Sequence, residues 1–527
     1  MAKKEDGVKN VWMVTREYDG LAGAGGVKDV SKQLSHALSR TGVKITVVMP
    51  LYGMMDKKKL GLKPLPCSFE VSMDYALEER LERVDIWKLM EDKVRIFLVE
   101  SGRFSEKKSI YTYTADDEAR DPDHKQGAGH RDYFATNILL QKAAMELAIY
   151  LDERPDVIHC QDGHAAVIPA MIREIDGYRA YFSETGCLIT VHNAGIGYHQ
   201  EVGDLLFAKA ITRLPAHVIE NCLLNNAFDP FIAGAGYGVI NTVSENYARE
   251  LRETDADRLT GWLGHTLKTM GITLEGVTNG IDPDDFNAGD PKRLGIAAAF
   301  DPLKGDLNGK EVSKQNLLDE IASGKLERVK IAGQIEYRPG VPLLTMVGRF
   351  MRQKGVDVLV SALETLMSKD KEFQFVALGT GSRDIEELLA AIATRPGNKG
   401  RAAILFGYNP ILANKIYAGG DFFVIPSQYE PCGLTDFMAQ LMGNIPIVHL
   451  TGGLVKVIDG ETGFGYAHHT PEALVSATKK AFNVYRKHPD ILRRMQRLAV
   501  ENIHARYTWD KVVERYLDLY ARAKGKR

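Results

Sequence analysis

The sequence predicts two doubly wound α/β domains, each with a parallel sheet covered on both faces by helices. At 527 residues the chain exceeds what one ordinary hydrophobic core holds. Short apolar runs that suit buried strands alternate with amphipathic helices almost throughout, a pattern typical of parallel sheets. The alternation restarts after a polar, charge-mixed stretch from about 290 to 342, which we interpret as the crossing between the two halves.

The composition narrows the class of protein. Hydrophobic residues make up 45% and charged residues 26%, as in ordinary globular chains, and a net charge of −2 offers no attraction to nucleic acid or anionic lipid. No apolar run approaches the roughly 20 residues that span a bilayer, and no apolar signal core follows the charged start. The scattered cysteines suit reduced thiols. We expect a cytoplasmic protein with no nucleic-acid or membrane partner.

The expected strands of both halves end in polar or turn-forming residues. In the first half they are "KITVVMP", "VRIFLVE", "DVIHCQD", "CLITVHN" and "GVINTVS", and in the second "PLLTMVGRF", "FQFVALGTG", "AAILFGY", "FFVIPSQ" and "IPIVHL". Ligands of open α/β sheets bind outside the carboxyl ends of strands, so these ends are where we look for chemistry. One segment departs from the pattern: Tyr111–Phe134 is long, charged and rich in turn formers, and we favour a mobile surface loop over a cleft lid.

A glycine loop, "GLAGAGGVKDV", follows the first expected strand, "NVWMVT". A dinucleotide fingerprint would have a third glycine where Lys28 stands and would lie closer to its strand, so a nicotinamide site is rejected. Gly25 and Gly26 open the next helix, where backbone amides can receive a phosphate or a sugar hydroxyl. A turn without any ligand explains the loop equally well, because the loop carries no base of its own.

Two further clusters lie at strand ends of the second half. In "GRFMRQKG", Arg349 ends a strand and Lys354 begins a helix, and two fixed cations suit a diphosphate leaving group, although surface cations are the alternative. In "PSQYEPCGLTDF", Glu430 stands just ahead of a helix, where glutamate caps poorly but can accept sugar hydroxyls. Downstream, "TGGL" supplies a second glycine turn with Thr451, Gly452 and Gly453.

Metal sites are the weaker interpretation of the remaining polar residues. "HCQDGH" and "HNAGIGYH" bring histidines and an aspartate, and Asp-x-Asp pairs occur in three polar stretches. No C-x-x-C or H-E-x-x-H pattern accompanies them. We therefore predict neither a metal site nor a cofactor.

The chain resembles the glycogen and starch synthases of bacteria and plants over nearly its whole length. The family's "VSRLxxQKG", "PSxxEPCGLTQ" and "TGGL" are similar to "VGRFMRQKG", "PSQYEPCGLTD" and the intact "TGGL". Its "HDWHA", "TVHN", "TTVSPTYARE" and "NGIDxxxWNPxxDP" are similar to "QDGHA", "TVHN", "NTVSENYARE" and "NGIDPDDFNAGDP". The ending "YTWDKVVERYLDLY" is similar to the family's last helix, which packs back on the first domain.

The resemblance implies a GT-B fold, with the two domains facing each other across a cleft. We expect an N-terminal domain over 8–335, a nucleotide-sugar-binding domain over 336–505, and a helix over 506–527 that returns to the first domain. It also implies a hexosyltransferase that moves glucose from a nucleoside-diphosphate glucose to the non-reducing end of an α-1,4-glucan, with retention. ADP-glucose is favoured over UDP-glucose by the bacterial resemblance alone. The sequence predicts no particular oligomeric state.

The resemblance also implies roles for individual residues. Arg349 and Lys354 would bind the diphosphate, Glu430 would hold the sugar, and His192 would lie beneath the glucose ring; these four are the catalytic candidates. Tyr408 would stack on the base, and Asp29 and Asp162 would line the sugar and acceptor side. The other substrate-binding candidates are Gly25, Gly26, Asn193, Cys432, Gly433, Leu434, Thr435, Thr451, Gly452 and Gly453.

Three departures from the family pattern qualify the function. Gly23 stands where the family's K-x-G-G-L loop has a lysine that touches the donor, and Lys28, inside the next helix, is not expected to turn back and replace it. "HNxxYQG" is loosened to "HNAGIGYHQE", and Asp436 stands where a glutamine is usual. Two alternatives therefore stay open: a related retaining transferase with another sugar nucleotide or a small acceptor, and a catalytically silent homologue that binds glucan or nucleotide.

Overall fold

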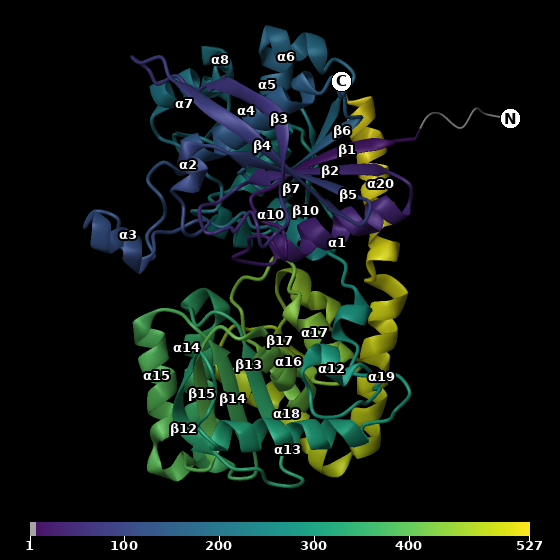
Figure 1. Cartoon of the computed structure of the whole chain (residues 1–527). Coiled ribbons are helices and arrows are strands. Elements are labelled where there is room, and N and C mark those ends of the chain that lie inside the picture. Colours follow the sequence, from purple (N-terminus) through teal and green to yellow (C-terminus); the bar gives the residue numbers. More distant parts are fainter. Residues whose placement is uncertain (1–6, 527) are drawn as a thin grey trace, which may run out of the picture. The chain divides into compact units, whose positions relative to one another are not determined.

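The computed structural model describes residues 7–526 and divides them into two α/β units (Figure 1). The first unit comprises the chain up to Gly280 together with the segment from Trp509, and the second unit is Ile281–Thr508. The charged start on which the expectation about export signals partly rests, residues 1–6, lies outside the described residues. Within them, no helix is both long and apolar enough to cross a membrane.

The described part of the first unit contains a nine-stranded sheet in the order β11-β10-β7-β6-β1-β2-β5-β4-β3. Seven strands run parallel: β1 (Asn10–Val14), β2 (Lys44–Pro50), β5 (Val94–Glu100), β6 (Val157–Gln161), β7 (Gly186–Val191), β10 (Val239–Thr242) and β11 (Glu275–Gly276). The hairpin of β3 (Lys63–Ser72) and β4 (Leu81–Glu91) adds an antiparallel edge. The carboxyl ends of β1, β6 and β7, neighbours in the sheet, therefore meet at one edge.

Helices complete the first unit. The glycine loop leads from β1 into α1 (Val27–Arg40), and α4 (Tyr133–Tyr150) is buried on nearly all sides, as its lack of a polar face requires. The last helix, α20 (Trp509–Gly525), packs against α1 and β7 (Figure 1). A side chain at Gly186 of β7 would lie 2.1 Å from the carbonyl oxygen of Ala523, so glycine permits this close approach.

The second unit has, among the described residues, a seven-stranded sheet in the order β12-β15-β14-β13-β16-β17-β18. The strands are β12 (Val329–Ile335), β13 (Leu343–Val347), β14 (Gln374–Gly379), β15 (Arg401–Gly407), β16 (Phe422–Ile425), β17 (Ile445–His449) and β18 (Phe464–Tyr466), and all pair in parallel except β12 with β15. One apolar core forms under α14 (Val356–Lys369), α15 (Arg383–Thr394), α18 (Pro471–Lys487) and α19 (Pro489–Arg506). Other cores form under α13 (Asn308–Ala322), α16 (Pro410–Gly419) and α17 (Thr435–Leu441).

The boundary between the units differs from the expected one at 335, because the chain leaves the first unit at Gly280. Helix α13 packs on α16, and the Nζ of Lys314 lies 2.8 Å from the Asp421 carboxylate and donates to the carbonyl of Val341 at 2.7 Å. The polar stretch from 290 to 342 thus contributes buried lysines and strand β12 to the second unit. At the other end the chain returns to the first unit after Thr508 rather than after residue 505.

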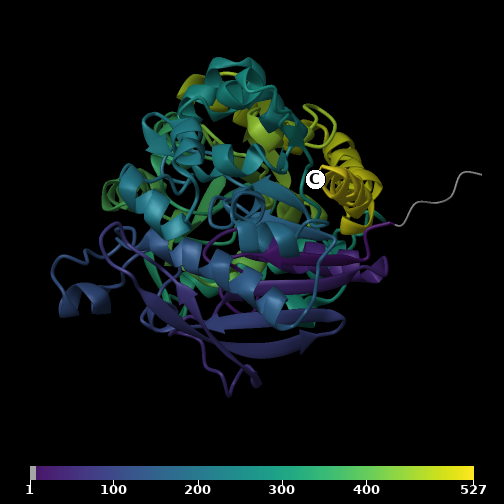
Figure 2. The same cartoon turned by 90° about the horizontal axis from the view of Figure 1, so that it is seen from above.

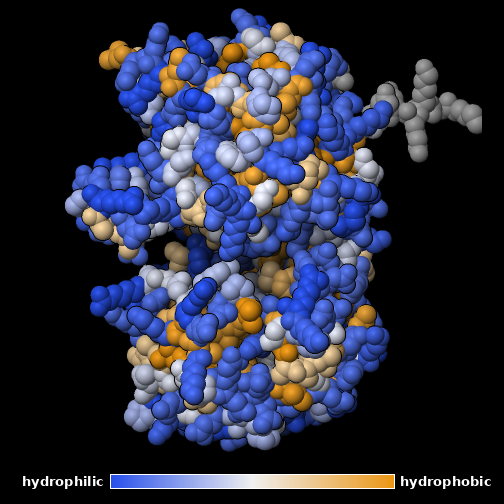
Figure 3. Space-filling model, in the orientation of Figure 1, coloured by the Kyte–Doolittle hydropathy of each residue, from blue (hydrophilic) through white to orange (hydrophobic). Residues whose placement is uncertain are grey.

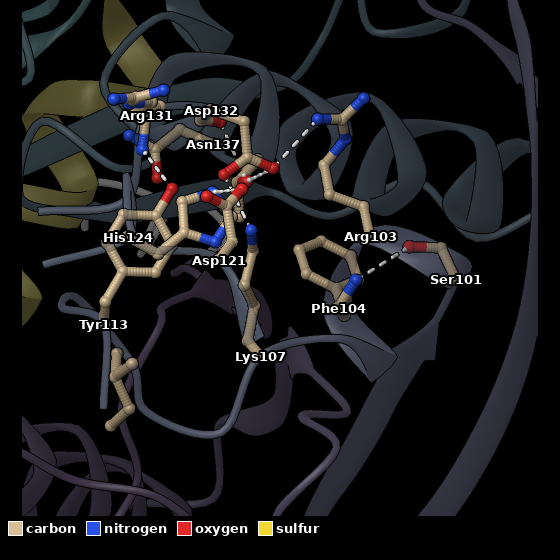
Figure 4. A network of polar contacts seen from close by, with 12 residues as sticks. Ser101, Arg103, Phe104, Lys107, Tyr113, Asp121, His124, Arg131, Asp132 and Asn137 are labelled. Atoms are coloured by element: carbon tan, nitrogen blue, oxygen red, sulfur yellow. Dashed lines mark hydrogen bonds and ion pairs between the residues drawn. The ribbon is translucent and has the colours of Figure 1, made fainter. Parts of the chain in front are cut away.

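The charged segment after β5 contains the short helix α3 (Ala115–Arg120), which stands out from the first unit in both cartoon views and is largely hydrophilic (Figures 1, 2 and 3). Ionic contacts hold its base: Asp132 accepts from Lys107 at 2.7 Å and from Arg103 at 3.0 Å (Figure 4). The ring of Tyr113 stacks on His124 with centroids 4.1 Å apart. The segment expected to be a mobile surface loop is therefore anchored by ion pairs and contains a short helix.

Candidate functional site

The glycine loop of the first unit is occupied by a carboxylate of the same chain. Glu17, which is 2% exposed, accepts hydrogen bonds from the backbone amides of Ala24 at 2.6 Å and Gly25 at 3.0 Å. The hydroxyl of Tyr111 donates to the other oxygen of Glu17. The Gly25 amide, expected to receive a phosphate or a sugar hydroxyl, thus already has a partner. Sequence reasoning missed Glu17 because no motif marks a side chain that folds onto loop amides seven and eight residues further on.

Lys28 turns back over Gly23, but its charge is paired with neighbouring carboxylates of the first unit. A Cβ at Gly23 would lie 2.2 Å from the Cδ of Lys28, so the lysine side chain fills the space beside this glycine. The Nζ of Lys28 lies 2.5 Å from Asp29 and 3.1 Å from Asp19. Burial lowers the pKa of Lys28, but the two carboxylates outweigh burial and raise it, so the ammonium is charged and neutralised within the loop.

Asp162 and His192 meet at the carboxyl ends of β6 and β7. The carboxylate of Asp162 accepts from the amide of His192 at 2.8 Å and, more weakly, from that of Asn193 at 3.4 Å. Burial raises the pKa of Asp162 to about 7, and burial also lowers the pKa of His192 to about 3, so its imidazole is neutral at neutral pH. The Nε2 of His192 lies 2.5 Å from the Oε1 of Gln161 and donates to it.

A buried chain of polar groups continues from Gln161 to the last helix. The amide nitrogen of Gln161 lies 3.2 Å from Nε2 of His159, and Nδ1 of His159 lies 2.9 Å from the hydroxyl of Tyr520 in α20. Burial lowers the pKa of His159 to about 3. The histidine weighed as a metal ligand is therefore satisfied by protein groups. Among residues 7–526, no cluster of three or more His, Cys, Asp or Glu side chains could hold a metal ion.

The loosened loop after β7 occupies the space beside Gly163, where the related motif has a tryptophan. A Cβ at Gly163 would lie 2.2 Å from the carbonyl oxygen of His199. His199 is anchored in turn, with Nδ1 2.6 Å from Asp229 and Nε2 2.7 Å from the carbonyl of Ala194. Gly163 and the loop after β7 are thus packed directly against each other.

In the second unit, Lys354 and Glu430 form a part-buried ion pair. The Nζ of Lys354 lies 2.6 Å from Oε2 of Glu430, and the hydroxyl of Ser427 donates to the same oxygen at 2.8 Å. Burial raises the pKa of Glu430, but Lys354 and then Ser427 outweigh it, so the net shift is downward and the carboxylate is ionised. Gly355 follows Lys354 with φ of +67°, and a Cβ on Gly355 would lie 1.8 Å from the carbonyl oxygen of Pro426. Only glycine fits this close approach, which places the neighbouring Lys354 beside Glu430.

The two glycine-containing motifs of this unit pack backbone against backbone. The amide of Gly453 donates to the carbonyl of Glu430 at 3.0 Å. A Cβ on Gly452 would lie 2.0 Å from that same carbonyl oxygen, and Gly433 has φ of +72°. Glycine is therefore required at these close approaches. Lys456, which sequence reasoning did not single out, lies beneath both motifs.

The other candidates of the second unit lie at the same ends of its strands. Arg349 follows β13 and is exposed, and Tyr408 follows β15 with 76% of its surface exposed. Leu434 and Thr435 lead from the "EPCG" turn into α17, and Thr451 precedes the glycine turn. In the first unit Gly26 precedes α1 and Asp29 lies in its first turn. Each unit therefore gathers its own candidates at strand ends.

Comparisons with known proteins cover both units. A family model described as starch synthase catalytic domain matches residues 10–265, and one described as glycosyl transferases group 1 matches 341–483. The chain is 30% identical to glycogen synthase 1 of Geobacter metallireducens and 31% identical to glycogen synthase 2 of Geobacter sulfurreducens. These alignments cover 98% of this chain and 96% and 99% of the relatives.

Solved structures share the fold. The catalytic domain of starch synthase IV from Arabidopsis thaliana bound to ADP and acarbose matches with a TM-score of 0.80 at 24% identity, over 99% of this chain and 100% of that one. The sucrose-phosphate synthase of Thermosynechococcus elongatus matches with a TM-score of 0.57 at 16% identity, over 98% of both chains. These likenesses support the two-domain α/β architecture predicted from the sequence.

Proposed function

Since the chain belongs to the glycogen and starch synthase family of glycosyltransferases, we propose that it transfers glucose from a nucleoside-diphosphate glucose to the non-reducing end of an α-1,4-glucan. The anomeric configuration is retained, and ADP-glucose is the favoured donor. The single observation that carries the proposal is the ion pair of Lys354 and Glu430 beside the packed "EPCGL" and "TGG" backbones. A cation for a diphosphate and an ionised carboxylate for sugar hydroxyls stand there side by side.

The second unit carries the donor contacts in this proposal. Arg349 and Lys354 bind the diphosphate and stabilise the charge that develops on it as the glycosidic bond breaks. Glu430 accepts hydrogen bonds from the glucose hydroxyls, and the backbone amides of Cys432, Gly433 and Leu434 donate hydrogen bonds to the same donor. Tyr408, exposed and free to offer a ring face, stacks on the base.

The first unit carries the sugar and acceptor contacts. Glu17 already occupies two loop amides, and Lys28 is neutralised by Asp19 and Asp29, so the loop has no surplus positive charge for a phosphate. Carboxylates suit hydroxyl groups, which supports a sugar-facing role for this loop. His192, neutral because of burial, lies beneath the glucose ring, and Asp162 and Asn193 orient its loop.

The proposed chemistry needs no protein nucleophile. The acceptor hydroxyl attacks the anomeric carbon from the face that the diphosphate leaves, and its proton passes to the departing phosphate oxygen. Both contacts of Glu430, from Lys354 and Ser427, fall on one carboxylate oxygen, which suits a hydroxyl acceptor held in place rather than an attacking group. Arg349 and Lys354 supply the positive charge that a divalent ion supplies in metal-dependent transferases.

A second candidate is a related transferase with a different donor or a small acceptor, and the internally filled glycine loop favours it. A matrix of donors and acceptors separates the two functions. ADP-glucose and UDP-glucose are each supplied with glycogen, with maltose or with glucose 6-phosphate, in excess chelator. The proposal predicts transfer from ADP-glucose to glycogen that the chelator leaves unchanged. Transfer only to the sugar phosphate supports the second candidate, and ADP binding without any transfer supports a silent homologue.

A further inference from the structure

A buried ammonium group joins the two glycine-containing motifs of the second unit. The Nζ of Lys456 donates to the carbonyl oxygens of Cys432 at 2.6 Å, Gly433 at 2.8 Å and Gly453 at 3.2 Å. It also lies 4.5 Å from the centroid of the Phe437 ring. Lys456 is only 9% exposed, so its cation is committed to these partners.

The counter-ion of Lys456 is Asp436, which is fully buried at the start of α17. Its Oδ1 lies 3.1 Å from the lysine Nζ, while Oδ2 accepts from the amide of Gln440 at 3.3 Å. Burial raises the pKa of Asp436 to about 6 against the opposing effect of Lys456, and burial lowers while Asp436 raises the pKa of the lysine, for a net rise. Both groups are therefore charged at neutral pH, and their charges cancel.

Fold stability alone does not explain the buried ion pair of Lys456 and Asp436. Taking two charges out of water is costly, and a buried pair often stabilises a fold no better than apolar residues of the same size. What an ammonium adds is three donors at one point, and here they gather three carbonyl oxygens from two separate turns. The contribution of Lys456 is therefore the conformation of the backbone at these turns.

The orientation of that backbone has a consequence at the donor site. In a trans peptide unit the C=O and the following N–H point in opposite directions. With the carbonyls of Cys432 and Gly433 directed at Lys456, the amide hydrogens of Gly433 and Leu434 point away from it. These are amides that the proposed function assigns to the donor.

We propose that Lys456 is a positioning residue for the nucleoside diphosphate. It holds the amides of Gly433 and Leu434 in the orientation that receives the diphosphate, and Asp436 keeps it charged. Lys456 also acts electrostatically on Glu430, whose pKa it helps to lower. The inference rests on the proposed function, because it takes the nucleoside diphosphate to bind at this turn.

The pair also explains why Asp436 replaces the family's usual glutamine. A glutamine at this position would leave the buried ammonium of Lys456 without its carboxylate. Restoring the family residue, Asp436→Gln, is therefore expected to weaken donor binding in this chain instead of improving it.

A matched pair of variants tests the inference. Lys456→Met removes the donors and keeps most of the side-chain volume. Lys310→Met is the control, because Lys310 is also buried in the second unit and donates to two carbonyls, those of Ala418 at 2.8 Å and Met442 at 3.1 Å. Each variant is titrated with ADP, and its KM for ADP-glucose, its KM for glycogen and its melting temperature are measured.

The inference predicts that Lys456→Met weakens ADP binding and raises the donor KM by tenfold or more, because small misplacements of binding groups cost up to about a hundredfold. The KM for glycogen stays within about twofold, and Lys310→Met changes only the melting temperature. Unchanged ADP binding by folded Lys456→Met, or an equal loss in Lys310→Met, overturns the inference. If Lys456→Met does not fold, Asp436→Gln carries the test with the same expected loss of ADP affinity. Failure of the wild type to bind ADP or UDP overturns the proposed function as well.

Discussion

The Nζ of Lys354 lies 2.6 Å from Oε2 of Glu430, which joins a lysine two residues ahead of α14 to a glutamate 76 residues later. The pair is part-buried, and Ser427 donates to the same carboxylate oxygen. The lysine keeps the carboxylate ionised against the effect of burial. A diphosphate that binds Lys354 would share this cation with Glu430, so the proposed diphosphate and sugar contacts would be coupled through one side chain.

Removing the charge of Glu430 tests its place in the site. Glu430→Ala and the near-isosteric Glu430→Gln are each expected to lower the transfer rate by about a hundredfold or more, because fixed polar groups in active sites contribute on this scale. The matched control is Glu364→Gln, since Glu364 pairs with Arg395 on the surface of the same unit. Circular dichroism and melting curves check the fold. Near-normal turnover in folded Glu430→Gln would remove this residue from the mechanism.

Restoring the family lysine at Gly23 is expected to raise activity only if Lys28 is shortened as well. The Cδ of Lys28 lies 2.2 Å from where a Cβ at position 23 would be, so Gly23→Lys alone displaces Lys28 and lowers activity. In the double variant Gly23→Lys, Lys28→Ala the new lysine has room, and kcat/KM for the donor rises about tenfold over that of Lys28→Ala. A gain in the single variant would show that Lys28 does not hold this space.

Asp162 makes stability depend on pH in a predictable direction. Burial raises its pKa from 3.8 to about 7, so between these values the folded protein holds a proton that the unfolded chain has released. The contribution is present in full below the lower value and is lost as the pH rises to about 7, by roughly 1.4 kcal/mol per pH unit.

Asp162→Asn lacks this titration. Urea unfolding of both proteins at pH 5.0, 6.0 and 8.0 is expected to show the wild type losing stability relative to the variant between 5.0 and 6.0. At pH 8.0 most of this loss has occurred, because the Asp162 carboxyl is then ionised in the folded protein as well. Parallel curves across the whole range would mean that the Asp162 carboxyl is ionised in the folded protein at pH 5.

Replacing Lys314 tests whether residues 281–335 belong to the second unit. Lys314→Met leaves the carboxylate of Asp421 without its ammonium, so the free energy of unfolding is expected to fall by about 3–5 kcal/mol. Asp421→Asn, added to Lys314→Met, should recover part of this loss, because the stranded charge is then removed. A loss in the single variant below about 1 kcal/mol would match a linker and contradict the packing of α13 seen here.

The sequence predicted the architecture because the alternation of apolar strands and amphipathic helices is a local pattern. The boundary expected at 335 differs from the division at Gly280, because composition cannot distinguish a solvated lysine from a buried one. Lys310 and Lys314 look like surface charges in a polar stretch, yet both ammonium groups reach carbonyls or carboxylates more than 25 residues away. Only the tertiary fold shows such partners.

The same limit applies to the site. Motif strings directed attention to Lys354, Glu430 and the glycine turns, which the structure brings together within one unit. They gave no sign that Glu17 fills the amides of the glycine loop or that Lys456 gathers three carbonyls under the turns. Both depend on where one long side chain points, which neither periodicity nor spacing encodes.

The most direct test of the central claim follows the transferred glucose into its product. Glycogen is incubated with the protein and radiolabelled ADP-glucose, and the washed polymer is digested with β-amylase, which releases maltose from non-reducing α-1,4 ends. The account predicts that nearly all of the incorporated label is released as maltose and that Glu430→Gln incorporates at least about a hundredfold less. Label that resists the digestion, or none incorporated by a protein that binds ADP, would contradict it.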